Sequence, residues 1–224
     1  MRTLRKLSAV MLLCLFCTSI YAQNDVTKFL GIPVDGTKSE MIKKLKSKGF
    51  VYNEYLDEFE GEFNGTDVQL SIVTNNNKVW RICVFDKYGR DEAQIKLRFN
   101  TLCKQFQNNG KYICLTDQSI PDDEDISDQM LLNSKKYNAT FSQIPADTAT
   151  LKKNVEEYLY SKYRYTKEDL ENLSEERQAE IGIDLLLKFI SKREVWFTII
   201  EEYNKYRILM YYDNKYNEAS GEDL

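Results

Sequence analysis

The residue types that carry most protein chemistry are sparse in this chain, and histidine is missing from all 224 residues. Without an imidazole, Ser-His-Asp and Cys-His arrangements are excluded, as are most transition-metal sites. An enzyme would then depend on paired carboxylates, as in glycoside hydrolysis. The candidate pairs are Glu201 with Glu202 in a predicted hairpin and Asp86 with Asp213 at predicted hairpin ends. Since the chain has 35 Asp and Glu residues, such pairs are expected on any solvated surface, and we predict no catalytic residues.

Metal and cofactor sites are not indicated either. The acidic run at 122–125 could attract Ca²⁺, but it lacks the spaced ligands and central glycine of an EF-hand loop. The nine glycines are scattered, so no loop is suited to hold a phosphate. The spacing of Cys83, Cys103 and Cys114 matches no zinc pattern. The sequence therefore predicts no metal and no cofactor.

Two of these cysteines are candidates for a disulfide. Cys103 lies near the end of a predicted helix that stops at Gly110, and Cys114 lies in a short strand expected to fold back along that helix. A bridge that closes so short a loop would stabilise the fold by about 3 kcal/mol. Alternatively, all three cysteines are buried thiols that pack as small apolar groups.

The N-terminus has the composition of a secretory signal peptide. Three basic residues within the first six precede an apolar run at 9–17, and the small residue Ala22 follows. We expect 1–22 to be a signal peptide and the mature protein to be exported to the periplasm or the extracellular space. The apolar run is shorter than the ~20 residues that span a bilayer.

The charge of the chain argues against two classes of partner. The formal net charge is −4, and loss of the three N-terminal basic residues takes it to −7. Nucleic acids and anionic membranes are bound mainly through clustered positive charge. We therefore expect no nucleic-acid partner. No later segment is apolar enough to cross a membrane, so we also expect no membrane span after signal cleavage.

Hydrophobic periodicity alternates between helix and strand, which predicts an α+β fold. Val68 and Leu70 share one face of a strand, as in an antiparallel sheet with one covered side. Thr37 can cap a helix with Glu40, and Gly49 can end it. The predicted helices are 37–49, 91–109, 148–163 and the stretch from 166 to 191. The predicted strands are 51–60, 66–74, 78–86, 111–115, 137–144 and the two arms of 195–214, and 121–129 is predicted to be an exposed loop.

Two predicted hairpins, at 68–87 and 195–214, resemble one another. Their first arms align without a gap, and one turn residue must be dropped to align the second arms. The matched residues are Val68/Val195, Leu70/Phe197, Ile72/Ile199, Trp80/Tyr206, Arg81/Arg207, Ile82/Ile208 and Val84/Met210. Alternatively, any two half-buried hairpins share such alternation by chance.

The order of elements around these hairpins also repeats. In each half a helix is followed by a glycine, Gly49 or Gly110, then by a strand and a hairpin. We predict tandem helix plus antiparallel sheet repeats at 23–90 and 91–224, with a helical insertion at about 147–192 in the second repeat. A second copy would cover the thin core and the open edge of the first.

Aromatic side chains are the most suggestive binding signal, since they make up 12% of the chain. Alternation along the strands places one set in the core and a second set on the opposite face. The candidate binding residues on that second face are Trp196, Thr198, Ile200, Phe85 and Tyr211. An uncovered aromatic face would suit contact with a protein or a glycan. Alternatively, the helices of the insertion pack on it.

Both ends of the chain resemble a group of uncharacterised small secreted proteins of Bacteroides-like bacteria. The matching residues are Gly31, Ile32, Pro33 and Gly36 before the first helix, and Tyr212, Asp213, Asn214, Asn217 and 221–224 at the tail. The resemblance implies an envelope location and a tandem layout, and it implies no catalytic residue. A looser likeness is to tandem helix-over-sheet modules of the beta-lactamase inhibitor protein type, which present a sheet face to another protein.

The expected function is that of an exported, non-enzymatic interaction module of the bacterial envelope, with another protein as its partner. A glycan-binding module and a carboxylate-dependent hydrolase are the alternatives. A purely structural subunit of a larger assembly would instead show one large apolar face.

Overall fold

The computed structural model describes residues 26–114, 116–145 and 147–219, so the expected signal peptide at 1–22 lies outside the described residues. The strands are β1 (Lys28–Phe29), β2 (Ile32–Pro33), β3 (Val51–Asn53), β4 (Glu58–Phe63), β5 (Thr66–Asn75), β6 (Lys78–Asp86), β7 (Tyr112–Ile113), β8 (Asn138–Gln143), β9 (Glu194–Glu202) and β10 (Lys205–Asp213). The helices are α2 (Lys38–Ser47), α3 (Glu92–Gln107), α4 (Ile126–Asn133), α5 (Thr148–Tyr163), α6 (Lys167–Glu171) and α7 (Glu175–Phe189).

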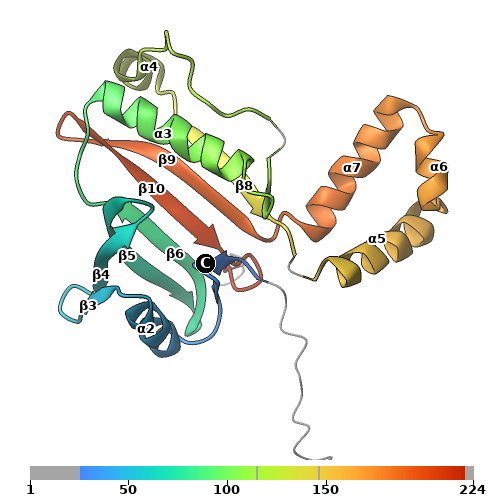
Figure 1. Ribbon diagram of the computed structural model, residues 1–224, viewed down its shortest axis with the longest axis horizontal. Helices are drawn as coiled ribbons and strands as arrows, with labels where there is room; N and C mark the ends of the chain where they lie inside the picture. The colour runs from blue at the N-terminus through green and yellow to red at the C-terminus, as the bar shows by residue number, and fades with distance from the viewer. Residues whose placement is uncertain (1–25, 115, 146, 220–224) are drawn as a thin grey trace, which may run out of the picture.

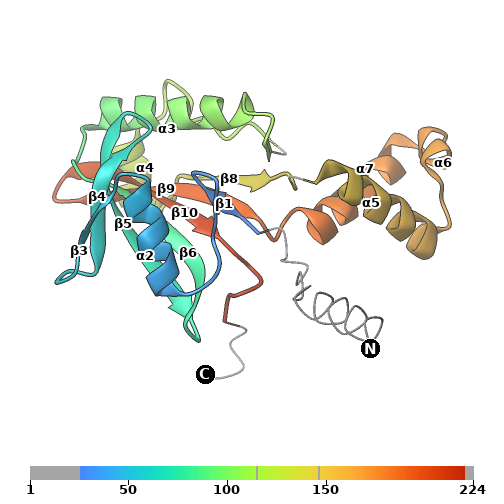
Figure 2. The same cartoon turned by 60° about the horizontal axis from the view of Figure 1, so that its bottom comes forward.

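Eight of the strands form one antiparallel sheet in the order β3-β4-β5-β6-β10-β9-β8-β7, and β1 pairs with β2 in a separate hairpin. Helices α2 and α3 lie on one face of this sheet, with α4 beside α3 (Figures 1 and 2). The predicted α+β class with an antiparallel sheet is confirmed. Because both sheet-covering helices lie on the same side, no helix of the described residues covers the other face of the sheet.

Capping side chains fix where these two helices begin. The Thr37 hydroxyl accepts from the backbone N–H of Glu40, whose carboxylate accepts from the backbone N–H of Thr37 at 2.9 Å. Asp91 and Gln94 form the same reciprocal pair before α3. Such pairs satisfy backbone donors that a helix leaves free in its first turn. After α2, Gly49 at φ +95° supplies the predicted left-handed residue.

Two-residue turns set the register of the long hairpins. Their residues all have positive φ, as type I′ hairpins require. The turns are Asn64–Gly65, Asn76–Asn77 and Tyr203–Asn204. Since a one-residue slip would move every side chain to the opposite face, these turns decide which residues enter the core.

One predicted strand, at 51–60, is wrong: the segment forms two strands, β3 and β4. Between them the Asn53 side chain accepts hydrogen bonds from the backbone N–H groups of Tyr55 and Leu56. Asp57 then adopts φ +57°. This side chain to backbone pairing reverses the chain where apolar alternation alone predicted a continuous strand.

The predicted loop at 121–129 and the predicted helix end at Gly110 also differ. The loop contains the start of α4, because Asp125 caps that helix and the fully buried Ile126 anchors it. Helix α3 ends at a cap on Asn108, and Gly110 is not in the left-handed conformation. Gly49 therefore takes the left-handed conformation after α2, whereas Gly110, which is matched to it in sequence, does not do so after α3.

Aromatic rings dominate the core of the second half, between α3 and the sheet. The Phe197 ring lies 5.0 Å from Phe99 and 6.0 Å from Phe141, centroid to centroid. Phe106 stacks on Phe141 at 4.7 Å. Rings at these separations add to the stabilisation that apolar burial provides, so α3 is fixed to the sheet through them.

The two halves of the sheet meet where β6 pairs with β10. Val84 lies opposite Met210, and these are matched positions in the two similar hairpins. The backbone N–H of Val79 donates to the carbonyl of Gly36 at 2.9 Å, and the N–H of Tyr206 donates to the carbonyl of Arg90 at 2.9 Å. Each carbonyl belongs to the residue before a helix cap. These correspondences support the tandem layout, and a common origin of the two halves stays a prediction.

The hairpin alignment needs one correction, at Trp80. Val73 pairs with Arg81 and Thr74 with Val79, so Trp80 is the extra residue of a bulge within the strand. The extra residue therefore lies in β6 and not in the turn, and Val79 corresponds to Tyr206.

The helical insertion, α5 to α7, leaves the sheet between β8 and β9 and lies beyond the end of these strands (Figures 1 and 2). Its helices are joined by Lys162 and Tyr163, which both donate to the Asp184 carboxylate at 2.8 Å. Because it lies beyond the strand ends, the insertion does not cover the sheet.

Within the described ranges, no helix has both the length and the apolar composition needed to cross a bilayer.

Replacing Phe197 by alanine should test the aromatic core. The side chain is fully buried, so Phe197→Ala should reduce the free energy of unfolding by about 3–5 kcal/mol. Urea unfolding at neutral pH measures the loss. Tyr203→Ala is the control, because that ring is 92% exposed at a hairpin tip. Equal stability of the two variants would contradict this packing.

Candidate functional site

The sheet face opposite the helices carries all five predicted binding residues. They are Trp196, Thr198 and Ile200 on β9, Phe85 on β6 and Tyr211 on β10, and each is partly buried. Their strand neighbours in sequence are buried on the helix side, as the alternation predicts. We call this surface the open face. Since the insertion lies beside the sheet, the alternative that it packs on these residues is wrong (Figures 1 and 2).

An aromatic stack lies at the centre of the open face. Trp196 lies directly opposite Tyr211, and their rings stack with centroids 4.1 Å apart at 26°. The Arg81 guanidinium lies 4.4 Å from the Tyr211 ring centroid, 5.6 Å from that of Trp196 and 4.2 Å from that of Trp80. A guanidinium within about 6 Å of a ring face is attracted to the ring's electrons. The three rings and the cation form one contiguous group.

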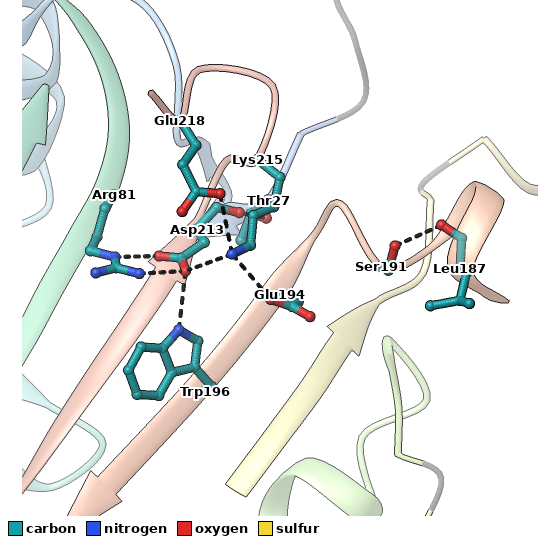
Figure 3. Close-up of polar contacts among 9 residues, drawn as sticks. All are labelled: Thr27, Arg81, Leu187, Ser191, Glu194, Trp196, Asp213, Lys215 and Glu218. Carbon is teal, nitrogen blue, oxygen red and sulfur yellow. Dashed lines mark hydrogen bonds and ion pairs between the residues drawn. The ribbon is translucent and has the colours of Figure 1, made fainter. Parts of the chain in front are cut away.

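The buried carboxylate of Asp213 holds this group in place (Figure 3). Arg81 donates to both of its oxygens, at 2.6 and 2.7 Å, and Trp196 Nε1 donates to it at 3.0 Å. Asp213 is fully buried, whereas Arg81 keeps 19% of its side chain exposed. A two-pronged pair of this kind fixes the plane of the guanidinium as well as its position. The cation and the indole ring are therefore oriented by a single acidic group.

Charges around Asp213 extend the network to the end of the chain. Lys215 Nζ lies 3.3 Å from Glu218, 3.5 Å from Glu194 and 3.9 Å from Asp213. Although burial lowers the pKa of Arg81, its hydrogen bond to Asp213 raises that pKa above the usual value overall. The Thr27 hydroxyl donates to the backbone carbonyl of Asp213 and ties the N-terminal segment to the same point.

A smaller group, Phe85 with Arg207, lies at the other end of the open face. The Arg207 guanidinium lies 5.3 Å from the Phe85 ring centroid and 3.1 Å from the Glu202 carboxylate. Arg81 and Arg207 are matched positions in the two hairpins, so each half places an arginine over a ring. The partly buried Leu209 lies between Phe85 and Thr198 and joins the two groups.

Sequence reasoning missed four members of the open face: Arg81, Asp213, Arg207 and Leu209. The two arginines stood in the hairpin alignment as matched positions, which was a signal for them. Asp213 gave no such signal as an anchor, because Arg81 and Trp196, which bind its carboxylate, come from two other strands, β6 and β9. Only the register of the β6–β10 pairing brings it opposite Arg81.

The carboxylate pairs considered for catalysis do not converge. Asp86 is bound by Arg90 at 2.5 Å and by Arg98 at 3.4 Å, and Asp213 is bound by Arg81. They lie at opposite ends of the β6–β10 pairing, about 17 Å apart at ~3.3 Å per residue. Glycosidase carboxylates are ~5–9.5 Å apart. This spacing excludes Asp86 and Asp213 as such a pair.

Glu201 and Glu202 likewise do not form a pair. They are consecutive exposed residues near a strand end, so their side chains point to opposite faces. Among the residues that the structure describes, no group of three or more Cys, Asp or Glu side chains could hold a metal ion.

The predicted Cys103–Cys114 disulfide is not formed in the structure, where both cysteines and Cys83 are thiols. Gln118 forms a hydrogen bond with each of two sulfurs. Its backbone carbonyl accepts from Cys103 Sγ at 3.8 Å, and its side-chain Nε2 donates to Cys114 Sγ at 2.8 Å. The Gln118 side chain also accepts from the backbone N–H of Thr140 at 2.7 Å and donates to its carbonyl at 2.8 Å. These two bonds replace those that a neighbouring strand would make. The loop after β7 is thus attached to β8 through this amide.

No protein-family model matches this chain, and no curated protein or solved structure matches it either. The resemblance to secreted Bacteroides-like proteins therefore stays a prediction.

Removing the cation of the buried pair should destabilise the protein. Arg81→Met leaves the Asp213 carboxylate buried without its counter-ion, and we expect a loss of about 3–5 kcal/mol in unfolding free energy. The double variant Arg81→Met/Asp213→Asn should recover part of that loss. Lys87→Met is the control, since it breaks only an exposed pair with Glu60 and should have a much smaller effect. Urea unfolding of all three variants gives the comparison.

Alkylation rates should separate the cysteines. Burial raises the pKa of the Cys103 thiol to about 12, so it carries almost no thiolate near neutral pH. Cys114 is only partly buried. With iodoacetamide at pH ~8, Cys114 should react first and Cys103 only on unfolding, as peptide mass spectrometry would show. Rapid labelling of Cys103 in the native protein would contradict its burial.

Proposed function

We propose that this chain is an exported, non-enzymatic module of a bacterial envelope that binds another protein through the open face. The single observation that carries the proposal is the face opposite α2 and α3, which no helix of the described residues covers, with its stack of Trp196, Tyr211 and Arg81. Tryptophan, tyrosine and arginine are the side chains that contribute most to binding when they lie near the centre of an interface. Here they are contiguous and central.

Rigidity supports the same proposal. Binding normally costs the freedom of the side chains that become ordered. On the open face that ordering has already occurred, because Asp213 orients Arg81 and Trp196 and because Trp196 stacks on Tyr211. A partner would therefore meet preorganised rings.

The dimensions of the face fit a protein partner. Strands β4, β5, β6, β10, β9 and β8 have six to ten residues each. At about 4.8 Å between strands and about 3.3 Å per residue, they span roughly 29 Å by 20–33 Å. That area is of the order of the ~800 Å² that each partner contributes to a standard interface.

The charges of the two arginines on this face are compensated within it. Arg81 is paired with Asp213, and Arg207 is paired with Glu202. Charge therefore contributes little to recognition at the rings themselves, and we expect the contacts made there to depend little on salt. This favours recognition through apolar and stacking contacts.

A photo-crosslinking experiment tests the proposal. Thr198, on the open face between Ile200 and Trp196, is replaced by p-benzoylphenylalanine, and the mature protein is irradiated in envelope extracts. We expect one protein to be crosslinked reproducibly and lost on Trp196→Ala, which removes the central ring. The same photo-residue in place of Tyr203, outside the stack at a hairpin tip, is the control position.

Trp196→Ala also removes a donor to Asp213, so a second variant separates folding from binding. Ile200→Arg places a bulky charge on the face next to the photo-residue and leaves the Asp213 contacts intact. Capture that survives both variants would contradict the proposal. Capture of a sugar polymer alone, dependent on Trp196, would favour the glycan-binding alternative.

A further inference from the structure

A cavity of about 1120 Å³ lies on the helix side of the sheet, away from the open face. Its walls come from the β1–β2 hairpin, the turn between β4 and β5, the C-terminal end of α3 and the end of β8. Pockets for small molecules usually have volumes of ~300–1,000 Å³. This cavity is therefore large enough for an organic ligand.

Most of the lining of the cavity is apolar. Rings come from Phe63, Phe106, Tyr112 and Tyr212, together with the aliphatic side chains of Leu30 and Ile144. Phe106 and Tyr112 lie edge to face with centroids 4.7 Å apart. An apolar lining with a few polar groups is the usual composition of a site for an amphipathic molecule.

The Tyr212 hydroxyl is the unusual polar group in this cavity. The residue is only 4% exposed, and its ring packs on Phe29 at 4.9 Å. Among the residues that the structure describes, its hydroxyl makes no hydrogen bond, and it is not one of the fully buried polar atoms, so it is accessible from the cavity. This hydroxyl lines the cavity, where a ligand could supply the missing partner.

Two further residues that line the cavity offer a hydrogen-bond donor and a cation. Tyr112 accepts from Gln143 Nε2 at 3.0 Å, which leaves its own hydroxyl proton free to be donated. Burial raises the pKa of Tyr112 and, more strongly, that of Tyr212, to which nearby Tyr112 adds, so both hydroxyls stay protonated at neutral pH. The exposed Lys111 lines the same cavity.

We propose that this cavity binds a small amphipathic carboxylic acid. The apolar body of the ligand lies against Phe63 and Phe106, and its carboxylate accepts from the hydroxyls of Tyr212 and Tyr112 near Lys111. Hydrogen bonds to a charged acceptor are the strong ones, which favours an acid over an alcohol. The site does not depend on the proposed function, because it lies on the opposite side of the sheet from the open face.

Calorimetric titration with laurate, and with dodecanol as the matched molecule without a carboxylate, tests the proposal on the mature protein. We expect laurate to bind more tightly than dodecanol. Tyr212→Phe removes only the hydroxyl and should weaken laurate binding about ten-fold, with no change for dodecanol. Absence of laurate binding, or equal affinity in Tyr212→Phe, would overturn the proposal.

A cavity-filling variant locates the ligand. A side chain at Gly110 meets open space, and this glycine lines the cavity, so Gly110→Phe should block laurate. Gly182→Phe is the matched control, because that glycine also faces open space but lies on α7. Contacts from laurate to the Phe63 and Phe106 rings in an NMR spectrum of the unmodified protein should agree. Binding unaffected by Gly110→Phe, without those contacts, would place laurate elsewhere and refute the site.

Discussion

The pairing of β6 with β10 is the constraint on which the rest of this structure depends. It joins two half-sheets, each with its own covering helix, into one sheet of eight strands. Without it, both strands would present a long row of unpaired backbone groups to solvent, which invites aggregation. It also places Arg81 opposite Asp213, and so the ion pair that orients the open face exists only in this register. One set of backbone hydrogen bonds thus determines both the core and the candidate binding surface.

Strand β10 contributes to both candidate sites because its side chains alternate. Tyr211 and Asp213 belong to the open face, whereas Tyr212 lies between them on the helix side and lines the cavity. Neighbouring residues of this strand therefore contribute to surfaces on opposite sides of the sheet. Because the strand lies within the sheet, Tyr211, Tyr212 and Asp213 are held between neighbouring strands. This arrangement would separate the proposed protein contact from the proposed ligand site without needing two domains.

Much of the fold could be predicted from local signals. Caps at Thr37 and the alternation along the strands are encoded within a few residues, and the predicted helix at 148–163 coincides with α5. The split of 51–60 was missed because one side chain, Asn53, competes with strand pairing. The start of α4 was missed because the charged residues before it indicated an exposed loop, whereas a single buried residue, Ile126, anchors the helix.

The candidate site likewise has one part that the local sequence predicts and one part that only the tertiary fold determines. Alternation alone placed Trp196, Thr198, Ile200, Phe85 and Tyr211 on one face, since that inference needs only a period of two. The anchoring role of Asp213 depends on strand order. Whether the helices of the insertion cover the open face depends on the direction in which the insertion extends. No local sequence pattern encodes either feature. The disulfide prediction failed for a related reason, because Gln118 reaches Cys103 and Cys114 from a loop whose course the sequence does not specify.

The most direct test of this account is the register of the central pair in solution. Backbone nuclear Overhauser effects should connect Val84 with Met210, flanked by contacts between Phe85 and Leu209 and between Cys83 and Tyr211. A register shifted by one residue, or β6 paired with a different strand, would contradict the account. Either result would turn Tyr211 to the helix side or part it from Arg81, and the open face as described would not exist.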